Sequence, residues 1–382
     1  MICQKYLLGE NMRNNILLLF GGNSVEHEIS IITAVQIIEK YKGKYNLIPC
    51  YLKEGLFYIS NKLKKIDTFK TEKFERKLKK IAFRANQNFI IQGIKKIHFD
   101  AVWIVAHGSN CEDGTLYSFF KTLNINVIAQ PPYSALIGHD KILLKKLCGI
   151  PIVPYIVIDN HSFSYDIKNI IEDACSLGFP LIIKPSNLGS SIGIKQVNDI
   201  DELMIEIEQT LCLSERLIVE KKIESFNELN IAAFSYEDEI YFSSIEKVSV
   251  NKVLSYEDKY LNQSKSMKDL KKELPAKISD ELERKIIEYT KEIYRNVNCK
   301  YIVRFDYIYD NVNDILYINE INNIPGSLAL YLFEDKGMNF DDIIDKYINQ
   351  GLIDIGKDKN IITSYENNIL KENNFIFSKT NK

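Results

Sequence analysis

Two short runs near the C-terminal third of the chain carry residue types that could hold a divalent cation. Residues 301–307 (YIVRFDY) and 316–322 (LYINEIN) alternate as strands do, and residues 310–314 (DNVND) between them have the composition of a turn. We therefore expect an antiparallel hairpin centred near Asn313. In each strand, side chains two residues apart would lie on the same face of the sheet.

Such a hairpin would gather polar side chains on one face. Its register places Asp306 opposite Glu320, and Arg304 opposite Asn322. Two bare carboxylates side by side repel, so one would protonate unless a cation lay between them. Oxygen ligands that include an amide favour a hard ion, Mg²⁺ above all. An exposed salt-bridge patch is the alternative, and the hairpin alone leaves both interpretations open.

A second run has the composition of a phosphate-binding loop. Residues 184–193 (KPSNLGSSIG) place Lys184 at the end of an expected strand, before a loop with glycine at two positions and adjacent serines. Glycines let backbone N–H groups approach phosphate oxygens, and the lysine adds a point charge. The run is not a Walker A loop, because a strand and not a helix is expected to follow. A hairpin turn with a chance lysine is the alternative. Joined to the carboxylate hairpin, the loop favours a phosphoryl-transfer site without a P-loop.

The hydrophobic pattern predicts an open parallel α/β sheet over residues 1–133. A continuous apolar run at 16–20 leads through a glycine turn into residues 26–41, where apolar residues recur at helical spacing. Ligands of such sheets bind at the carboxyl ends of the strands.

Two further regions are expected, residues 134–224 and residues 225–355. The elements expected in them are helix 135–148, strands 181–184, 193–197, 217–220, 229–234 and 240–248, helix 279–296 and the hairpin. Residues 251–273 form a long polar segment, and segments of this kind tend to be lids over active sites. The chain is rich in lysine and asparagine from Gly351 onward, so we expect fraying there and a tail at 356–382.

Composition excludes several classes of function. Of the 382 residues 46% are hydrophobic and 26% charged, and the formal net charge of −2 gives no electrostatic case for nucleic acid or an anionic membrane. The seven cysteines show no CxxC spacing, which argues against a zinc site and fits a reducing compartment. No apolar run approaches the roughly 20 residues that span a bilayer, and no signal peptide is recognised. We expect a cytoplasmic protein without membrane or nucleic-acid partners.

The loop, the lysine and the carboxylate hairpin together resemble the ATP-grasp fold, in which two α+β domains enclose ATP. Further runs are similar to D-alanine–D-alanine ligases and occur in that family's order from about Ile16 to about Ile348. These runs are 19–30 (LFGGNSVEHEIS), 107–108 (HG), 112–115 (EDGT), 140–141 (DK), 184–193, 255–260 (SYEDKY), 304–306 (RFD) and 319–326 (NEINNIPG). The resemblance implies an N-terminal α/β domain followed by a two-domain ATP-grasp fold, and a homodimer formed through the N-terminal region.

The resemblance also implies which residues bind ATP and metal. ATP would contact Lys141, Lys184, Ser191, Glu220, Lys221, Ile223, Glu228 and Lys259. Among these, Lys141 and Lys184 would meet the phosphates, residues 220–223 the adenine, Glu228 the ribose, and Lys259 the γ-phosphate. Asp306, Glu320 and Asn322 would bind two Mg²⁺ ions, with Mn²⁺ as a substitute.

For the first D-alanine, Glu26 would orient the ammonium group in a hydrogen-bonded set with Ser190 and Tyr260. Arg304 and the backbone at Gly326 would hold the substrate and the oxyanion formed on attack, and His107 would line the same subsite. Each assignment has a structural alternative: Glu26 as a first-turn helix carboxylate, His107 as a buried strand-end histidine, and Lys259 with Tyr260 as solvent-exposed loop residues.

The second-substrate pocket departs from the family pattern. Tyr331 takes the place of a serine that usually holds the second substrate's carboxylate, and Ser327 or the Tyr331 hydroxyl could substitute for it. The implied reaction joins two D-alanines through an acyl phosphate, for peptidoglycan and cell-wall synthesis. The alternatives are a D-alanine–D-serine ligase, another ATP-grasp carboxylate–amine ligase, and a non-catalytic nucleotide-binding relative.

Overall fold

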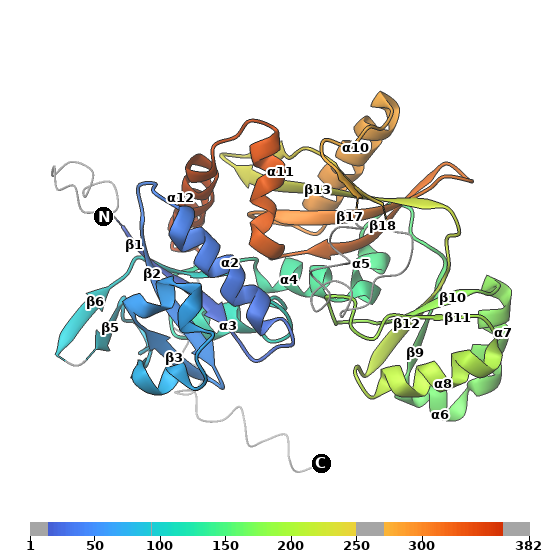
Figure 1. Cartoon of the computed structure of the whole chain (residues 1–382), viewed down its shortest axis with the longest axis horizontal. Helices are drawn as coiled ribbons and strands as arrows, with labels where there is room; N and C mark the ends of the chain where they lie inside the picture. The colour runs from blue at the N-terminus through green and yellow to red at the C-terminus, as the bar shows by residue number, and fades with distance from the viewer. Residues whose placement is uncertain (1–13, 93, 250–270, 362–382) are drawn as a thin grey trace, which may run out of the picture.

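The computed structural model describes residues 14–92, 94–249 and 271–361, which form three larger sheets with helices packed against them (Figure 1). The first sheet has the strand order β4-β3-β2-β1-β7-β8. Its strands are β1 (Asn15–Gly21), β2 (Asn46–Lys53), β3 (Leu56–Ile59), β4 (Lys79–Ile81), β7 (Ala101–Ile104) and β8 (Val127–Ile128). Because β1 runs parallel to β2 and β7, and β7 to β8, the predicted parallel sheet is confirmed. The antiparallel strands β3 and β4 extend one edge and were not expected.

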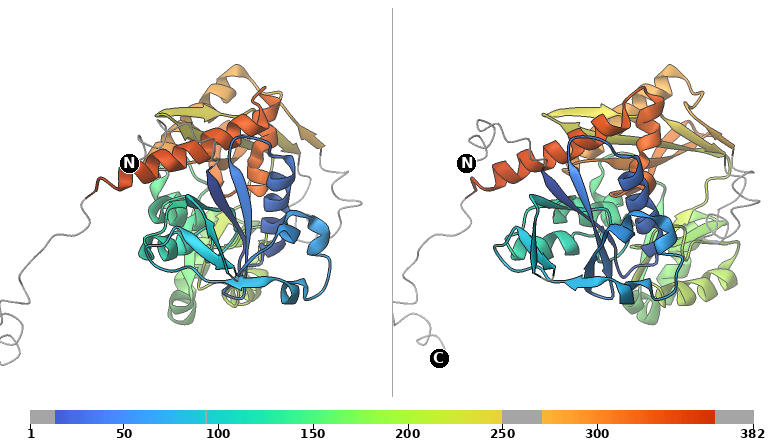
Figure 2. Two further views of the ribbon diagram at one scale, coloured as in Figure 1. Left: turned by 90° about the vertical axis from the view of Figure 1, so that its left-hand side faces the viewer. Right: turned by 60° about the vertical axis from the view of Figure 1, so that its left-hand side comes forward.

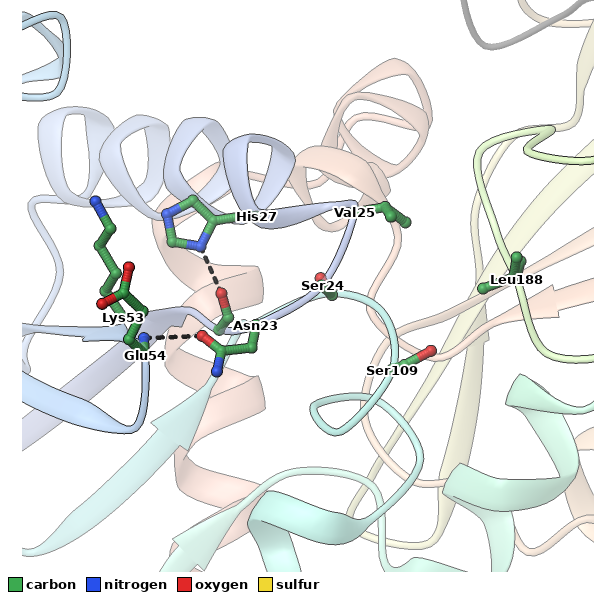
Figure 3. A pocket seen from close by; sticks show the side chains of 9 residues that line it. Asn23, Ser24, Val25, His27, Lys53, Glu54, Ser109 and Leu188 are labelled. Atoms are coloured by element: carbon green, nitrogen blue, oxygen red, sulfur yellow. Dashed lines mark hydrogen bonds between the residues drawn. The ribbon is translucent and has the colours of Figure 1, made fainter. Parts of the chain in front are cut away.

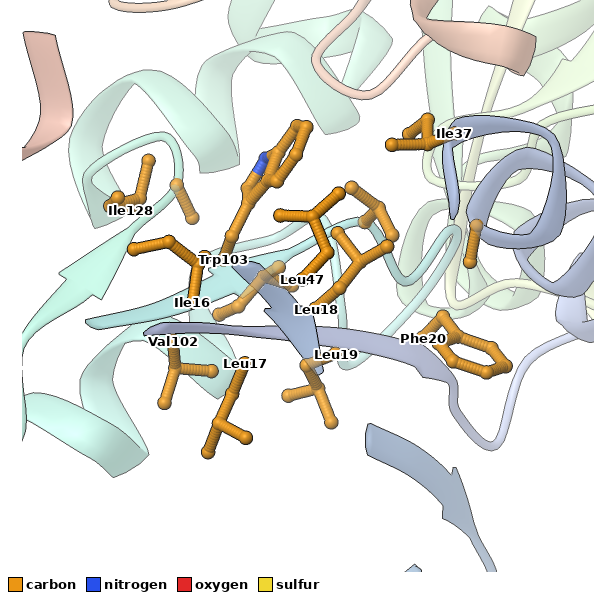
Figure 4. Close-up of a cluster of buried hydrophobic side chains, with 14 of the residues drawn as sticks. Ile16, Leu17, Leu18, Leu19, Phe20, Ile37, Leu47, Val102, Trp103 and Ile128 are labelled. Atoms are coloured by element: carbon orange, nitrogen blue, oxygen red, sulfur yellow. The ribbon is translucent and has the colours of Figure 1, made fainter. Parts of the chain in front are cut away.

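Short elements complete this first region. They are helices α2 (His27–Lys40) and α3 (Thr115–Thr122), the 3₁₀ turns η1 (Asn61–Lys64), η2 (Ile66–Thr68) and η3 (Phe74–Lys77), and the paired strands β5 (Phe89–Gln92) and β6 (Lys95–His98). The apolar run of β1 is wholly buried, as its lack of alternation predicts for a strand covered on both faces. Figure 4 shows this core, with Leu17 and Leu19 on one side of the strand and Leu18 on the other.

The second sheet is antiparallel, with the order β11-β10-β12-β9. It consists of β9 (Tyr155–Asp159), β10 (Leu181–Pro185), β11 (Lys195–Val197) and β12 (Arg216–Lys221), with helices α6 (Asn160–Tyr165), α7 (Ile167–Leu177) and α8 (Ile200–Leu211) beside it. Helices α4 (Pro132–His139) and α5 (Lys141–Leu147) connect it to the first region. Lys184 lies near the end of β10, as predicted.

The third sheet has the order β16-β15-β13-β17-β18, with β14 also paired to β13. Its strands are β13 (Phe226–Tyr236), β14 (Glu239–Phe242), β15 (Glu246–Ser249), β16 (Lys271–Glu273), β17 (Val303–Asp310) and β18 (Ile315–Asn322). Helix α10 (Asp280–Asn296) packs on this sheet, and η5 (Gly326–Ala329), α11 (Leu330–Asp335) and α12 (Phe340–Asp358) follow it.

The structure confirms the predicted hairpin register at the residues that are expected to bind metal. Arg304 pairs with Asn322, and Asp306 pairs with Glu320. A bulge after Asp306 then shifts the remaining pairs by one residue, so that Tyr307 lies opposite Ile318. Bulges change the direction in which neighbouring side chains point, and this one lies directly beside the predicted metal ligands.

Two expected elements are each divided in two. The helix expected over 135–148 is interrupted at Asp140, whose carboxylate accepts hydrogen bonds from the N–H groups of Ile142 and Leu143 at 2.8 and 3.1 Å. An aspartate that caps a new helix in this way satisfies its first free donors, and the break makes Lys141 the first residue of α5. The strand expected over 240–248 is divided into β14 and β15.

The expectation that the chain frays from Gly351 is wrong for residues 351–358. Helix α12 continues to Asp358 and lies against β8 of the first sheet (Figure 2). A Cβ atom at Gly351 would come within 2.6 Å of the Ile128 side chain, so the glycine permits this close approach. The rings of Trp103 and Tyr347 lie 4.9 Å apart in the same core, which therefore joins the first region of the chain to helix α12.

Within the described part of the chain, none of the helices combines the length and the apolar character needed to cross a membrane.

Candidate active site

The carboxylate hairpin forms a compact hydrogen-bonded group. Arg304 donates to both oxygens of Asp306, from Nε at 2.6 Å and from its terminal nitrogen at 2.7 Å. The amide nitrogen of Asn322 donates to the same carboxylate at 3.0 Å. Asp306 is buried, and the Glu320 side chain is 31% exposed. The bidentate pair with Arg304 places a positive charge beside the two adjacent carboxylates and reduces their mutual repulsion.

Two lysines from other elements reach toward this hairpin. The ammonium group of Lys184 lies 2.9 Å from Oδ1 of Asn319, which is part of β18. Lys141 lies 3.8 Å from Glu320 and donates to the carbonyl of Leu188 in the glycine–serine loop at 2.7 Å. Burial lowers the pKa of Lys141, and the charge of Glu320 opposes that shift. The loop, the two lysines and the hairpin are thus brought together as predicted.

Glu220 has a buried side chain in a position where the sequence predicts contact with adenine. Its two oxygens lie 2.7 Å from the ammonium of Lys145 and 2.6 Å from that of Lys184. Burial by itself would raise the pKa of Glu220, but the two lysines outweigh it and hold the pKa at about 2. Sequence reasoning missed Lys145, although its place four residues after Lys141 on a helix would have put both on one face.

The remaining predicted ATP contacts lie along β12, β13 and the loops. The N–H of Lys221 donates to the carbonyl of Pro154 at 3.0 Å, which fixes the start of the predicted adenine segment. Ile223, Glu228 and Ser191 are half-buried, and Ser191 has a left-handed backbone with φ of 60°.

Glu26 contacts the glycine–serine loop, as predicted. The hydroxyl of Ser190 donates to Glu26, although Glu26 lies just before α2 in the first region. Its side chain makes no capping hydrogen bond to that helix, although its position at the N-terminus of α2 also suits a carboxylate stabilised by the helix dipole. A Cβ atom at Gly189 would lie 3.0 Å from the Glu26 oxygens, and the glycine therefore lets the loop backbone approach the carboxylate.

His107 and Glu112 position the strand-end loop after β7. His107 is buried, and burial lowers the pKa of its imidazole to about 4, which keeps the ring neutral near pH 7. Glu112 accepts hydrogen bonds from the N–H of Gly108 at 2.9 Å and from that of Ile324 at 3.2 Å. Burial and the nearby charge of Glu26 raise the pKa of Glu112 to about 8. Glu112 therefore links the loop after β7 to the segment before Gly326, a role that sequence reasoning did not assign.

Both hydroxyl groups predicted for the second substrate already have partners in the protein. The Tyr331 hydroxyl donates to the buried carboxylate of Glu246 at 2.9 Å, and Lys272 donates to the other oxygen at 3.1 Å. The Ser327 hydroxyl donates to Gln36 at 2.5 Å. No signal in the sequence pointed to Glu246.

The backbone after Gly326 is strained. Residues 327–329 all have φ between 49° and 51°, a conformation that is unfavourable for side chains with a Cβ atom. Strain of this kind is often found at functional sites.

A cavity of about 480 Å³ is lined by residues on both sides of Glu26 in the sequence, among them Val25 and His27. Figure 3 shows the loop of Asn23, Ser24 and Val25 on one side of it, and Leu188 of the glycine–serine loop on the other. Lys259, Tyr260 and most of the expected lid at 251–273 lie outside the described residues.

The lysine-bearing antiparallel sheet, the glycine–serine loop and the carboxylate hairpin define an ATP-grasp fold, which is also the fold of the similar solved structures. The family models for the D-ala D-ala ligase N-terminus and C-terminus match residues 15–129 and 143–349. The chain belongs to the D-alanine–D-alanine ligase family and is an ATP-dependent ligase.

Three similar proteins illustrate the match. The D-alanine–D-alanine ligase of Thermosipho melanesiensis is 35% identical over 94% of this chain and 98% of its own. The crystal structure of the D-alanine–D-alanine ligase from Helicobacter pylori has a TM-score of 0.69 at 28% identity, over 87% of this chain and 98% of that one. The VanG D-Ala:D-Ser ligase from Enterococcus faecalis has a TM-score of 0.74 at 26% identity, over 89% of this chain and 100% of that one.

Proposed function

We propose that this ligase joins two D-alanines to make D-alanyl-D-alanine for peptidoglycan precursors, and that the residues described above carry the reaction. The observation that supports this most is the convergence of Lys141 and Lys184 on the Glu320 hairpin, with the Ser190–Glu26 contact beside it. Cationic and anionic groups that face each other in this way suit a phosphate chain clamped between lysines and metal-bound carboxylates.

Activation of the first substrate is the step that ATP makes possible. A carboxylate is a poor acyl donor because its leaving group would be an oxide, and transfer of the γ-phosphoryl group converts it to an acyl phosphate. Lys141, Lys184 and, in our proposal, Lys259 hold the phosphates, while the segment 220–223 and Glu228 hold adenine and ribose. Ser191 donates to a phosphate from the loop, where the backbone approaches closely.

Asp306, Glu320 and Asn322 fit a pair of Mg²⁺ ions, because all three offer oxygen ligands and none is a thiolate or imidazole. When bound, these ions would neutralise charge on the phosphates. The contacts of Arg304 and Asn322 with Asp306 must loosen to free the carboxylate oxygens for metal. Arg304 is then available to the substrate, which couples metal binding to substrate binding.

The first D-alanine lies, in our proposal, between the first and third regions of the chain. Glu26 receives its ammonium group, with Ser190 and Tyr260 holding the Glu26 carboxylate in place. Arg304 and the backbone N–H at Gly326 face the developing oxyanion. His107, neutral because it is buried, supports this subsite without adding charge.

The second D-alanine is held by Ser327 more readily than by Tyr331. Ser327 donates to Gln36, which is exposed, so exchange of that hydrogen bond for a substrate carboxylate costs little. Tyr331 donates to Glu246, which is buried, and loss of that donor costs about 1–3 kcal/mol. Tyr331 would therefore form a wall of the pocket with its proton committed to Glu246.

D-serine is the second candidate for this subsite, because the Glu246 carboxylate near Tyr331 could accept a hydrogen bond from a substrate hydroxyl. The similarity to a D-Ala:D-Ser ligase is consistent with that candidate.

We also propose the broader assignments that the sequence implies. These are a division of the chain into domains that end at residues 133, 224 and 355, a lid at 251–273, a homodimer formed through the N-terminal region, and a cytoplasmic location. The six cysteines of the described residues are all free thiols, which suits a reducing compartment.

Mass spectrometry of the products from D-alanine, D-serine, D-lactate and ATP–Mg²⁺ supplied together tests this proposal. We expect D-alanyl-D-alanine as the main product, with one phosphate released for each bond formed. A main product that contains D-serine would establish the second candidate. No product containing D-alanine would overturn both.

A further inference from the structure

Lys145 is the most deeply buried cation of the nucleotide end of the site, with 1% of its side chain exposed. It lies one helical turn after Lys141 on α5, so both side chains point the same way. Its ammonium group lies 2.7 Å from Oε1 of Glu220 and 5.3 Å from the centre of the Tyr155 ring. Lys145 has no role in the ligase mechanism described above, because its side chain is too deeply buried to contact a substrate.

Glu220 is shared between two lysines, one on each oxygen. Its Oε2 lies 2.6 Å from the ammonium of Lys184, which also contacts Asn319 of the hairpin. The buried group of Lys145, Glu220 and Lys184 thus has two positive charges and one negative charge. If Lys145 were absent, Glu220 would pair with Lys184 alone, and the group would have no net charge to offer an anion.

We propose that Lys145 is a positioning residue for nucleotide binding, which occupies Glu220 so that Lys184 keeps its positive charge for the phosphates of ATP. The inference rests on the proposed contact between Lys184 and ATP. Glu220 in turn holds Lys184 in place between β12 and the hairpin, and Lys145 prevents that anchor from neutralising the lysine. Electrostatic attraction to an anion is strong in a largely buried site, so an ammonium group fully paired with a carboxylate binds phosphate more weakly than one that shares that carboxylate with a second lysine.

A purely structural role for Lys145 makes a different prediction. Replacement of a whole buried ion pair by apolar residues is often neutral or stabilising, whereas removal of one partner leaves an uncompensated charge and destabilises the fold. If Lys145 served only packing or stability, its loss would lower the melting temperature and the amount of active enzyme. It would not change the affinity for ATP selectively.

The first experiment replaces Lys145 with methionine, which keeps the length of the side chain and removes the charge. We expect Lys145→Met to raise the KM for ATP and the Kd for ATP–Mg²⁺ about tenfold, with kcat and both D-alanine KM values within about twofold of wild type. Lys146→Met is the matched control, because Lys146 is the exposed neighbour on the same helix and its loss should change neither constant. A fall in kcat alone, or an equal rise in the ATP and D-alanine constants, would overturn the proposal.

The second experiment repeats the substitution where Glu220 carries no charge. In the Glu220→Gln background, Lys184 no longer faces an anion, so Lys145→Met should raise the Kd for ATP less than about twofold. The same tenfold rise in both backgrounds would show that Lys145 does not act through Glu220, and the inference would fail.

Two further measurements distinguish a failure of this inference from a variant that does not fold and from a failure of the proposed function. If Lys145→Met does not fold, Lys145→Gln replaces it, because the amide can still donate to Glu220 while the charge is removed. A Kd for ATP–Mg²⁺ within about twofold of wild type would then contradict the proposal. If wild-type enzyme binds ATP–Mg²⁺ but ligates no D-alanine, the proposed function fails while the role of Lys145 remains measurable by equilibrium binding.

Discussion

The two ends of the active site are built in different ways. The metal end is a single hairpin, in which Arg304, Asp306, Glu320 and Asn322 meet because two neighbouring strands pair across a short turn. The nucleotide end is assembled from α5, β10, β12 and β18, which are separate in the sequence. A local pairing rule fixes the first end, whereas the packing of several elements fixes the second. Substitutions at the metal end should therefore change mainly kcat, whereas substitutions at the nucleotide end should change mainly the affinity for ATP.

The largest expected effect lies at the hairpin. Glu320→Gln keeps the shape of the side chain but removes the charge that a divalent ion needs, so we expect kcat to fall roughly 10³-fold. Phosphate release measured against Mg²⁺ concentration checks this, with no recovery expected at high Mg²⁺. Glu288→Gln, an exposed carboxylate on α10, is the control and should keep full activity. Activity of Glu320→Gln near that of the control would remove Glu320 from the metal site.

At the nucleotide end, loss of the phosphate-facing lysine should weaken binding more than it slows the chemical step. Lys184→Met removes one charge from a largely buried site, and we expect kcat/KM for ATP to fall roughly 10²-fold. Calorimetric titration with ATP–Mg²⁺ measures the affinity directly. Lys195→Met changes an exposed lysine on the neighbouring strand and serves as the control. A loss confined to kcat would place Lys184 at the reacting atoms and not at bound nucleotide.

The nucleotide end should also be sensitive to acid. The pKa of Glu220 is about 2 in the folded protein, below its usual value of 4.5, so its contribution to stability is present above pH 4.5 and is lost as the pH falls toward 2. Between pH 5 and pH 3 this loss amounts to about 2 kcal/mol. Urea unfolding at both pH values should show a shallower loss for Glu220→Gln than for wild type, while Glu288→Gln should match wild type. Equal slopes for all three would contradict the assigned ion pairs.

The smallest effect is expected beyond the hairpin, in the second-substrate pocket. Tyr331→Phe removes one hydrogen bond from Glu246, so the free energy of unfolding should fall by about 1 kcal/mol. The KM of the weaker-binding D-alanine should change less than about threefold, because the Tyr331 proton is not available to a substrate carboxylate. Steady-state kinetics and thermal unfolding measure the two effects. A tenfold rise in that KM would instead assign the carboxylate to the Tyr331 hydroxyl.

The contrast between the two ends also explains which features could be predicted from the sequence. The pairing of Asp306 with Glu320 follows from strand alternation and the position of the turn, both of which are local, and the structure confirms it. The Lys145–Glu220 pair depends on how α5 packs against β12, and no periodicity in the sequence reports that. Asp140 is a second feature that the local pattern did not predict. The apolar spacing of residues 135–148 is helical throughout, so it did not indicate that Asp140 ends one helix and caps the next, α5.

The sequence by itself determined the family, the order of most elements, the pairing of Arg304 with Asn322 and of Asp306 with Glu320, and the oxygen and lysine groups of the site, because short motifs and side-chain periodicity encode these directly. Only the tertiary structure decided that Glu220 anchors two lysines, that Glu112 ties the loop after β7 to the segment before Gly326, and that Tyr331 gives its proton to Glu246. Each of these is a buried polar contact between distant segments. Burial obliges such groups to find partners, but the partner is selected by packing and not by local sequence.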